Sequence, residues 1–156
     1  MAKYGVSFGA FATTTSILTA LKLMSATKVP VEIVETAMYG SGTVAPADIQ
    51  HECTMAAVSA AGAGTGAASP PTGEPFGPNK AAAAAATILW KMTAEPTTYA
   101  TVFPILFSFN QRGGMRWAVP RGEGMGNVFE NTQMHIGQRV RSSAVGTVDG
   151  HLHWWE

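Results

Sequence analysis

Apolar and polar residues alternate along most of this chain, a pattern that predicts short β-strands. Within residues 29–39, Val29, Val31 and Ile33 fall on one face and Glu32 on the other. Comparable strand segments lie at residues 16–26, 49–58, 86–93, 101–109, 115–119, 133–141 and 148–155. With Gly-, Pro- and Ser-rich turns between them, they predict an all-β fold, a single antiparallel β-sandwich of jelly-roll-like type over residues 1–156.

Two late strands have the most regular alternation. In the strand at 101–109, the shared apolar face consists of Phe103, Ile105, Phe107 and Phe109. In the last strand, one register consists of Val148, Leu152 and Trp154, and the other of His151, His153 and Trp155. The first of these registers belongs in the core, and the second faces outward.

The segment NQRGGMRWAVPRGEG, residues 110–124, joins two predicted strands. Its Arg-Gly-Gly group at 112–114 supplies residues that adopt positive φ angles, which a tight turn needs. The sequence therefore predicts a β-hairpin, in which Trp117 points inward and Arg116 points outward.

Two segments are predicted to reach neighbouring subunits. Residues 60–80 contain five glycines and four prolines and cannot bury enough apolar area to offset the entropy of ordering them. We expect a long loop there, ordered by contact with another subunit. Residues 1–14 are predicted to form an N-terminal arm with a similar role, and the alanine run at 81–86 adds a helical turn.

The composition changes this picture in one respect. Charged residues make up 13% of the 156 residues and hydrophobic residues 46%, which is unusually little charge for a free monomer. Much of the surface is therefore expected to be covered by partners. Ten basic residues balance ten acidic ones, so we expect neither nucleic acid nor a membrane as partner. Polar residues interrupt the N-terminal stretch, which argues against an export signal and for synthesis in the cytoplasm.

Several motifs imitate catalytic or nucleotide sites. The glycines of GAGTG at 62–66 and GEGMG at 122–126 lack the following helix that a phosphate site needs, so we interpret them as flexible loops. Gly-Val-Ser-Phe-Gly at 5–9 matches the nucleophile elbow of serine hydrolases, but no core strand precedes Ser7, and nothing places Asp149 and His151 beside it. We therefore expect no enzymatic activity and no cofactor.

The spacing of His151 and His153 allows a metal site. Two histidines at i and i+2 on one strand face bind zinc or nickel when a third ligand converges on them. The sequence does not identify that ligand, and surface or interface histidines are the commoner case, as they are for His51 and His135. Cys53 is expected to be a small core residue.

Arginine and tryptophan are the residues expected at an interface, because they combine large contact area with directed hydrogen bonds. Trp154 is assigned to the core. The predicted interface residues are Arg112, Arg116, Trp117, Arg139, Arg141 and Trp155, together with Pro70, Pro71 and Phe76 of the long loop.

The order of several segments resembles that of small virion proteins of tailed bacteriophages. These segments are VPVEIVE followed by GSGT (40–43), AEPT (94–97), FNQRGGMRWAVPRGEG (109–124) and the terminal HLHWWE (151–156). NQR followed by RW and a Pro/Gly turn is the most distinctive of them, and the resemblance covers nearly the whole chain.

This resemblance implies a capsid decoration, or cement, protein: a β-sandwich that assembles as a homotrimer on the capsid exterior and binds the major capsid protein. The alternative is a structural or receptor-binding module associated with the tail, baseplate or fibre.

Overall fold

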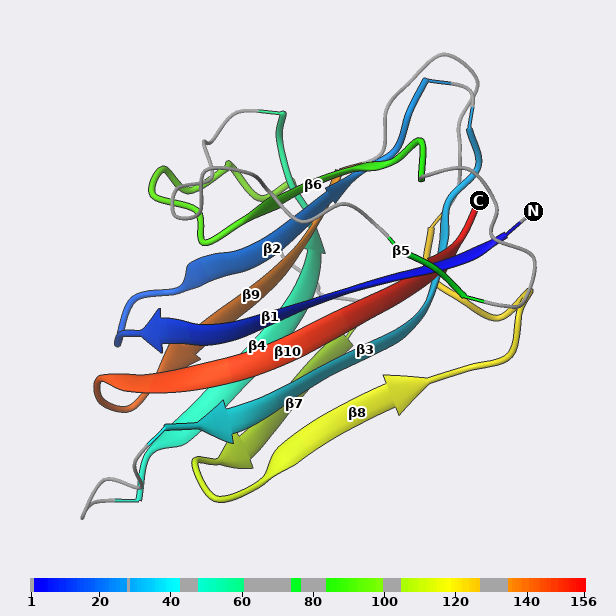
Figure 1. Cartoon of the computed structure of the whole chain (residues 1–156). Helices are drawn as coiled ribbons and strands as arrows, with labels where there is room; N and C mark the ends of the chain where they lie inside the picture. Colours follow the sequence, from blue (N-terminus) through cyan, green and yellow to red (C-terminus); the bar gives the residue numbers. More distant parts are fainter. Residues whose placement is uncertain are drawn as a thin grey trace.

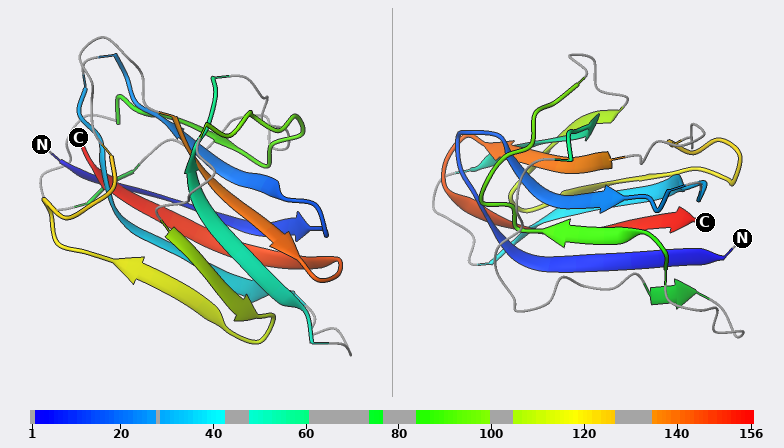
Figure 2. Two further views of the ribbon diagram at one scale, coloured as in Figure 1. Left: turned by 180° about the vertical axis from the view of Figure 1, so that it is seen from behind. Right: turned by 90° about the horizontal axis from the view of Figure 1, so that it is seen from above.

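The computed structural model describes residues 2–27, 29–42, 48–60, 74–76, 84–99, 105–126 and 135–156. They form two antiparallel sheets of five strands each, packed as the predicted β-sandwich (Figures 1 and 2). The strands are β1 (Lys3–Thr13), β2 (Leu18–Met24), β3 (Glu32–Ser41), β4 (Gln50–Ala57), β5 (Glu74–Phe76), β6 (Thr87–Trp90), β7 (Ile105–Asn110), β8 (Gly114–Ala118), β9 (His135–Ser142) and β10 (Gly146–Trp155).

Neighbouring strands in each sheet are far apart along the chain. The sheet that we call sheet A has the order β5-β1-β10-β3-β8, and sheet B has the order β6-β2-β9-β4-β7. All eight pairings are antiparallel. The chain repeatedly crosses between the sheets, so each sheet contains strands from both halves of the sequence.

The N-terminal segment is part of sheet A. β1 lies between β5 and β10, and the main chains of Ala2 and Glu156 exchange two hydrogen bonds, of 2.7 and 3.1 Å. The prediction of an arm over residues 1–14 is therefore wrong. Alternate side chains from Tyr4 to Phe8 are buried, and this apolar face holds the segment in the sheet.

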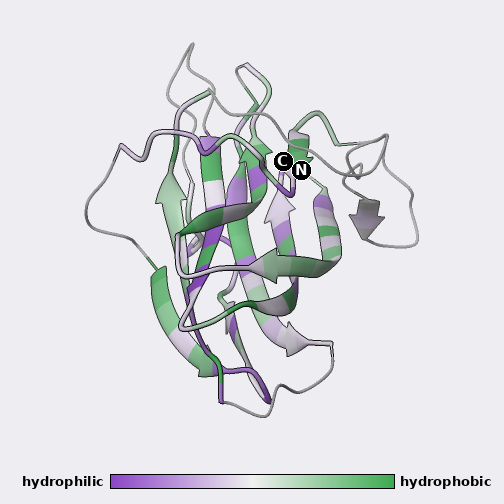
Figure 3. Ribbon diagram, turned by 90° about the vertical axis from the view of Figure 1, so that its left-hand side faces the viewer, coloured by the Kyte–Doolittle hydropathy of each residue, from purple (hydrophilic) through white to green (hydrophobic). Residues whose placement is uncertain are grey.

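The core lies between the two sheets. Hydrophobic and polar residues alternate along the strands of both sheets (Figure 3). The largest fully buried side chain is Trp154, which stacks on Tyr4 with the ring centroids 5.9 Å apart. The predicted inward faces are confirmed for six residues: Ile105, Phe107, Phe109, Val148, Leu152 and Trp154. Phe103 lies outside the described residues.

One polar side chain crosses the core. Gln138 of β9 in sheet B donates hydrogen bonds from Nε2 to Thr36 Oγ1 at 2.9 Å and to the Ala37 carbonyl at 3.0 Å, both on β3 of sheet A. Gln138 and Thr36 are fully buried, and these bonds satisfy the amide nitrogen of Gln138, whereas its Oε1 has no hydrogen-bond partner among the described residues.

The segment between β7 and β8 is a corner between the sheets. β7 pairs with β4 in sheet B, whereas β8 pairs with β3 in sheet A, so the predicted hairpin is wrong. Gln111 fixes the corner by donating from Nε2 to the Ser41 carbonyl at 2.7 Å. Gly40 permits the close approach, because a Cβ there would lie 1.8 Å from the Gln111 carbonyl oxygen. Neither glycine of the Arg-Gly-Gly group has a positive φ.

Most of the predicted long loop, residues 61–73 and 77–80, lies outside the described residues, as do residues 81–83 of the alanine run. Residues 74–76 between them form β5, which pairs with β1 at the edge of sheet A. The described part of the alanine run, residues 84–86, is not helical.

Candidate functional site

A cluster of polar side chains lies on the outer face of sheet A. Glu35 of β3 accepts a hydrogen bond from Arg116 of β8, with 2.6 Å between Arg116 Nε and Glu35 Oε1. Its carboxylate also contacts two histidines of β10, with 3.0 Å from Oε1 to His151 Nε2 and 3.0 Å from Oε2 to His153 Nδ1. We call these four residues the Glu35 cluster.

The pairing of β3 with β10 positions the cluster. His153 lies directly opposite Glu35, whereas Trp154 lies opposite Ile33, so Val34 is an extra residue in β3. Such a β-bulge changes the face on which the following side chains lie. Strict alternation would put Glu35 on the inward face with Ile33; the bulge turns it outward, beside the histidines.

Three of the four residues, Glu35, His151 and His153, are well shielded for an outer face. The Glu35 side chain is 9% exposed, compared with 22% for His151 and 18% for His153. The hydrogen bond from Arg116 holds the pKa of Glu35 well below its usual range and outweighs burial, which acts in the opposite direction. Burial lowers the pKa of His153, although the contact with Glu35 opposes this. An ionised carboxylate therefore faces the imidazoles.

Three members of the cluster form a set of potential metal ligands. One ligand atom each from Glu35, His151 and His153 lies within 4.8 Å of the others. The sequence indicated the two histidines but not the third ligand. The glutamate was present in a predicted strand, but its face could not be deduced without the bulge.

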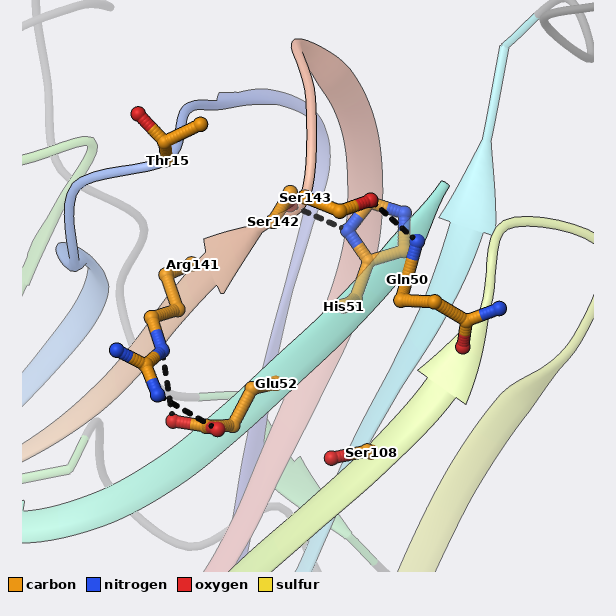
Figure 4. Close-up of a pocket in the computed structure, with 8 residues that line it drawn as sticks. All are labelled: Thr15, Gln50, His51, Glu52, Ser108, Arg141, Ser142 and Ser143. Carbon is orange, nitrogen blue, oxygen red and sulfur yellow. Dashed lines mark hydrogen bonds and ion pairs between the residues drawn. The ribbon is translucent and has the colours of Figure 1, made fainter. Parts of the chain in front are cut away.

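A shallow hollow lies on the outer face of sheet B, at one end of β4 and β9 (Figure 4). Its volume is about 390 Å³, and its lining residues are Thr15, Gln50, His51, Glu52, Ser108, Arg141, Ser142 and Ser143. Arg141 and Glu52 lie opposite each other in the β4–β9 pair and form two contacts of 2.9 Å. Because these charges neutralise each other, the hollow has no net charge with which to attract an ionic ligand.

His51 is buried at the inner side of this hollow. Its Nδ1 lies 2.6 Å from Ser142 Oγ, and its Nε2 lies 2.5 Å from Gln111 Oε1. Burial lowers the pKa of His51. Gln111 Oε1 can only accept, so Nε2 carries the proton and Nδ1 accepts a hydrogen bond from the Ser142 hydroxyl. These two contacts hold the buried ring as a neutral imidazole in a fixed orientation.

Three predicted interface residues lie on or beside β8. The Arg112 side chain is 64% exposed and lies 3.6 Å from Asp48, and the Arg116 side chain is 59% exposed. Trp117 packs against the core, so the predicted inward tryptophan and outward arginine are confirmed.

The other predicted interface residues are dispersed. Arg141 lines the hollow, and Trp155 is half-buried with the Arg121 guanidinium 5.4 Å from its ring. Arg139 is buried, hydrogen-bonded to Thr98 and 3.6 Å from Glu95, so the structure does not support its assignment to an interface. Phe76 lies in β5 opposite Lys3, and Pro70 and Pro71 lie outside the described residues.

The main-chain amides of the second glycine-rich segment, residues 122–126, are hydrogen-bonded to the carboxylate of Glu32. Glu32 Oε1 accepts hydrogen bonds from the main-chain amides of Gly122 at 2.6 Å and Gly124 at 2.8 Å. The loop therefore has the amide arrangement of an anion site, but a carboxylate already occupies it. The first segment, at 62–66, lies outside the described residues.

The hydrolase-like residues do not form a triad. Ser7 lies opposite His151 in the pairing of β1 with β10, but it is in the middle of a strand rather than at a sharp turn. His151 contacts Glu35, and Asp149 accepts a hydrogen bond from the Ala10 amide at 2.7 Å. Cys53 is a fully buried core residue, as predicted, and burial raises the pKa of its thiol.

The described residues include no helix that is long and apolar enough to cross a membrane. Comparisons of the chain with protein-family profiles, with curated proteins and with solved structures give no match.

Proposed function

We propose that the protein is a non-enzymatic structural protein of a bacteriophage virion, a capsid decoration protein that binds the major capsid protein on the capsid exterior. The observation that carries this proposal is the strand order. Apart from β5 and β6, the sheets have the orders β1-β10-β3-β8 and β2-β9-β4-β7, and these two four-stranded sheets support the proposal of an eight-stranded jelly roll. Jelly rolls are a recurrent architecture of viral capsid domains. The resemblance to phage virion proteins adds the biological context.

One side of the sandwich supports assembly with other chains. β7 and β8 are the edge strands of their sheets, and among the described residues each pairs with one strand only. Two large apolar side chains are exposed there, Leu106 at 59% and Met115 at 43%. An edge with unpaired main-chain groups and exposed apolar residues is suited to contact with another polypeptide. We propose that this surface, the β7–β8 side, forms contacts in a homotrimer or with the shell.

The physical role of such a protein follows from these contacts. Packaged DNA pushes shell subunits apart, and a protein that bridges several subunits adds buried area that is lost if they separate. The low proportion of charged residues, 13%, is consistent with a surface that is largely covered in the particle.

Charged substitutions on the β7–β8 side test the proposed contacts. We expect the full wild-type chain to be a trimer that binds capsid shells, and Leu106→Lys combined with Met115→Lys to abolish trimer formation, shell binding or both. Val145→Lys is the matched control, because Val145 is 75% exposed but lies in the turn between β9 and β10. Light scattering after size-exclusion chromatography gives the oligomeric state, and cosedimentation measures shell binding. A wild-type monomer that does not bind shells would refute the proposal.

Imaging of labelled protein on intact virions tests the location. A decoration protein labels the whole shell, whereas label confined to the tail would contradict the proposal and favour a tail-associated module.

A further inference from the structure

We propose that Glu35, His151 and His153 together bind one divalent transition-metal ion, best matched by Zn²⁺, on the outer face of sheet A. The donors come from two neighbouring strands, with His153 directly opposite Glu35 and His151 two residues along β10. Because the β3–β10 pairing fixes their main chains, the three side chains are already together before a metal ion binds. This site is additional to the proposed assembly function and does not depend on it.

The distances between donor atoms are near those of a zinc site but wider for at least one pair. Zinc lies about 2.0–2.2 Å from histidine nitrogen and carboxylate oxygen, so neighbouring ligand atoms of a tetrahedral site are about 3.3 Å apart. His151 Nε2 and His153 Nδ1 are each 3.0 Å from an oxygen of Glu35, and the three ligand atoms lie within 4.8 Å of one another. The widest separation, of up to 4.8 Å, must therefore close by about 1.5 Å when an ion binds, through rotation of the side chains.

The protonation states of the two histidine rings are compatible with metal binding. Without metal, each imidazole donates an N–H to Glu35 from the nitrogen that faces it. A metal ion takes the lone pair of that same nitrogen, and the proton of a neutral ring moves to the other ring nitrogen. Glu35 remains an ionised acceptor throughout.

The donor chemistry selects the class of metal. Imidazole nitrogen suits Zn²⁺, Cu²⁺, Ni²⁺ and Fe²⁺, whereas Mg²⁺ and Ca²⁺ prefer sites made of oxygen ligands. Two histidines and one glutamate are also a known ligand set for zinc with a remaining open position. On this face, that position is available to water or to a donor from a neighbouring subunit.

Arg116 competes with the metal ion for Glu35. Its Nε lies 2.6 Å from Oε1, the oxygen that also contacts His151, and its positive charge repels a cation. The side chain is 59% exposed, so it has space to move away. Removal of this arginine should therefore tighten metal binding, which a purely structural role for the histidines does not predict.

Titration of the full chain with Zn²⁺, measured by calorimetry, tests the site directly. We expect one ion per chain, and an affinity lowered by at least about tenfold in His151→Ala, His153→Ala and Glu35→Gln. His135→Ala is the matched control and should bind as the wild type does, because His135 lies in sheet B, away from the cluster. Co²⁺ should give the intense visible absorption of a four-coordinate site in the wild type and the control.

Arg116→Ala is the complementary variant, with an affinity for Zn²⁺ expected to increase about tenfold. Near-ultraviolet circular dichroism establishes that each variant is folded, and variants that unfold are replaced by His151→Gln and His153→Gln. The proposal is overturned if the wild type shows no saturable Zn²⁺ binding. It is equally overturned if folded variants of both cluster histidines bind as tightly as the wild type.

Discussion

His51 and the His151–His153 pair occupy opposite sheets of the sandwich, and their hydrogen-bond partners differ in charge. His51 is buried between Ser142 and Gln111, both of which are neutral. The other two histidines are half-buried and face the carboxylate of Glu35. The two sites therefore offer their histidine rings different chemistry. Neutral partners fix the His51 ring within the structure, whereas the carboxylate of Glu35 gives the other two rings a group with which they could share a metal ion.

Among the substitutions considered, we expect the largest loss of stability at His51. His51→Ala removes a buried ring, leaves a cavity and deprives Ser142 and Gln111 of a partner, so we expect a loss of about 3 kcal/mol in the free energy of unfolding. His153→Ala removes a half-buried ring that faces solvent, and a loss of about 1 kcal/mol is expected. Urea denaturation measures both. Equal losses would contradict the distinction between the two sites.

The next effect is at the centre of the Glu35 cluster. Glu35→Gln keeps the size of the side chain but replaces an ionised acceptor by an amide, which puts an N–H donor among the donors of Arg116 and the two histidines. We expect the free energy of unfolding to fall by about 2 kcal/mol in metal-free solution at neutral pH. No loss would show that the carboxylate contributes nothing to folding.

The contributions of His51 and Glu35 to stability should also be lost at different pH values. His51 has a pKa lowered by burial, so its contribution to stability is complete above pH about 6.5 and falls as the pH decreases towards its folded pKa. His135 and His153 are half-buried, and their pKa values are also lowered by burial, so they add to this step. Glu35 also has a lowered pKa, and its contribution is complete above pH about 4.3 and is lost at lower pH.

Denaturation measured across this pH range should therefore show two acid-dependent losses of stability. Glu35→Gln should diminish the loss at lower pH and keep the one at higher pH. If the variant instead has the same pH profile as the wild type, Glu35 does not titrate as its contacts indicate.

The smallest effect is expected at the hollow. Glu52 also pairs with an arginine, Arg141, but its side chain is 31% exposed, compared with 9% for Glu35. Glu52→Gln should change the free energy of unfolding by less than about 0.5 kcal/mol, because water and salt screen exposed ion pairs. Measured beside Glu35→Gln, it tests whether burial makes the difference; equal losses from the two variants would falsify that explanation.

The positions of the strands could be predicted from the sequence, but their pairing could not. Alternation is a local property, so it correctly assigned inward faces to Phe107, Phe109, Leu152 and Trp154. Whether two adjacent strands pair with each other depends on contacts with distant segments. The corner at Gln111 was therefore mistaken for a hairpin, and the opening strand for an arm.

Only part of the candidate metal site could be predicted, because alternation within one strand says nothing about a neighbouring strand. His151 and His153 belong to one strand, and their common face follows from period two. Glu35 lies on another strand after a bulge at Val34, and a single-residue bulge leaves no definite trace in an alternating pattern. The third ligand could be recognised only when the two strands were seen side by side.

The amide of Gln138 has a mechanical consequence. It joins β9 to β3 through the middle of the sandwich, at Thr36 and Ala37, immediately after Glu35. Apolar contacts between layers resist separation but have little directional preference, whereas hydrogen bonds do. Sliding of one sheet over the other would therefore have to break these two hydrogen bonds in addition to disturbing the apolar packing.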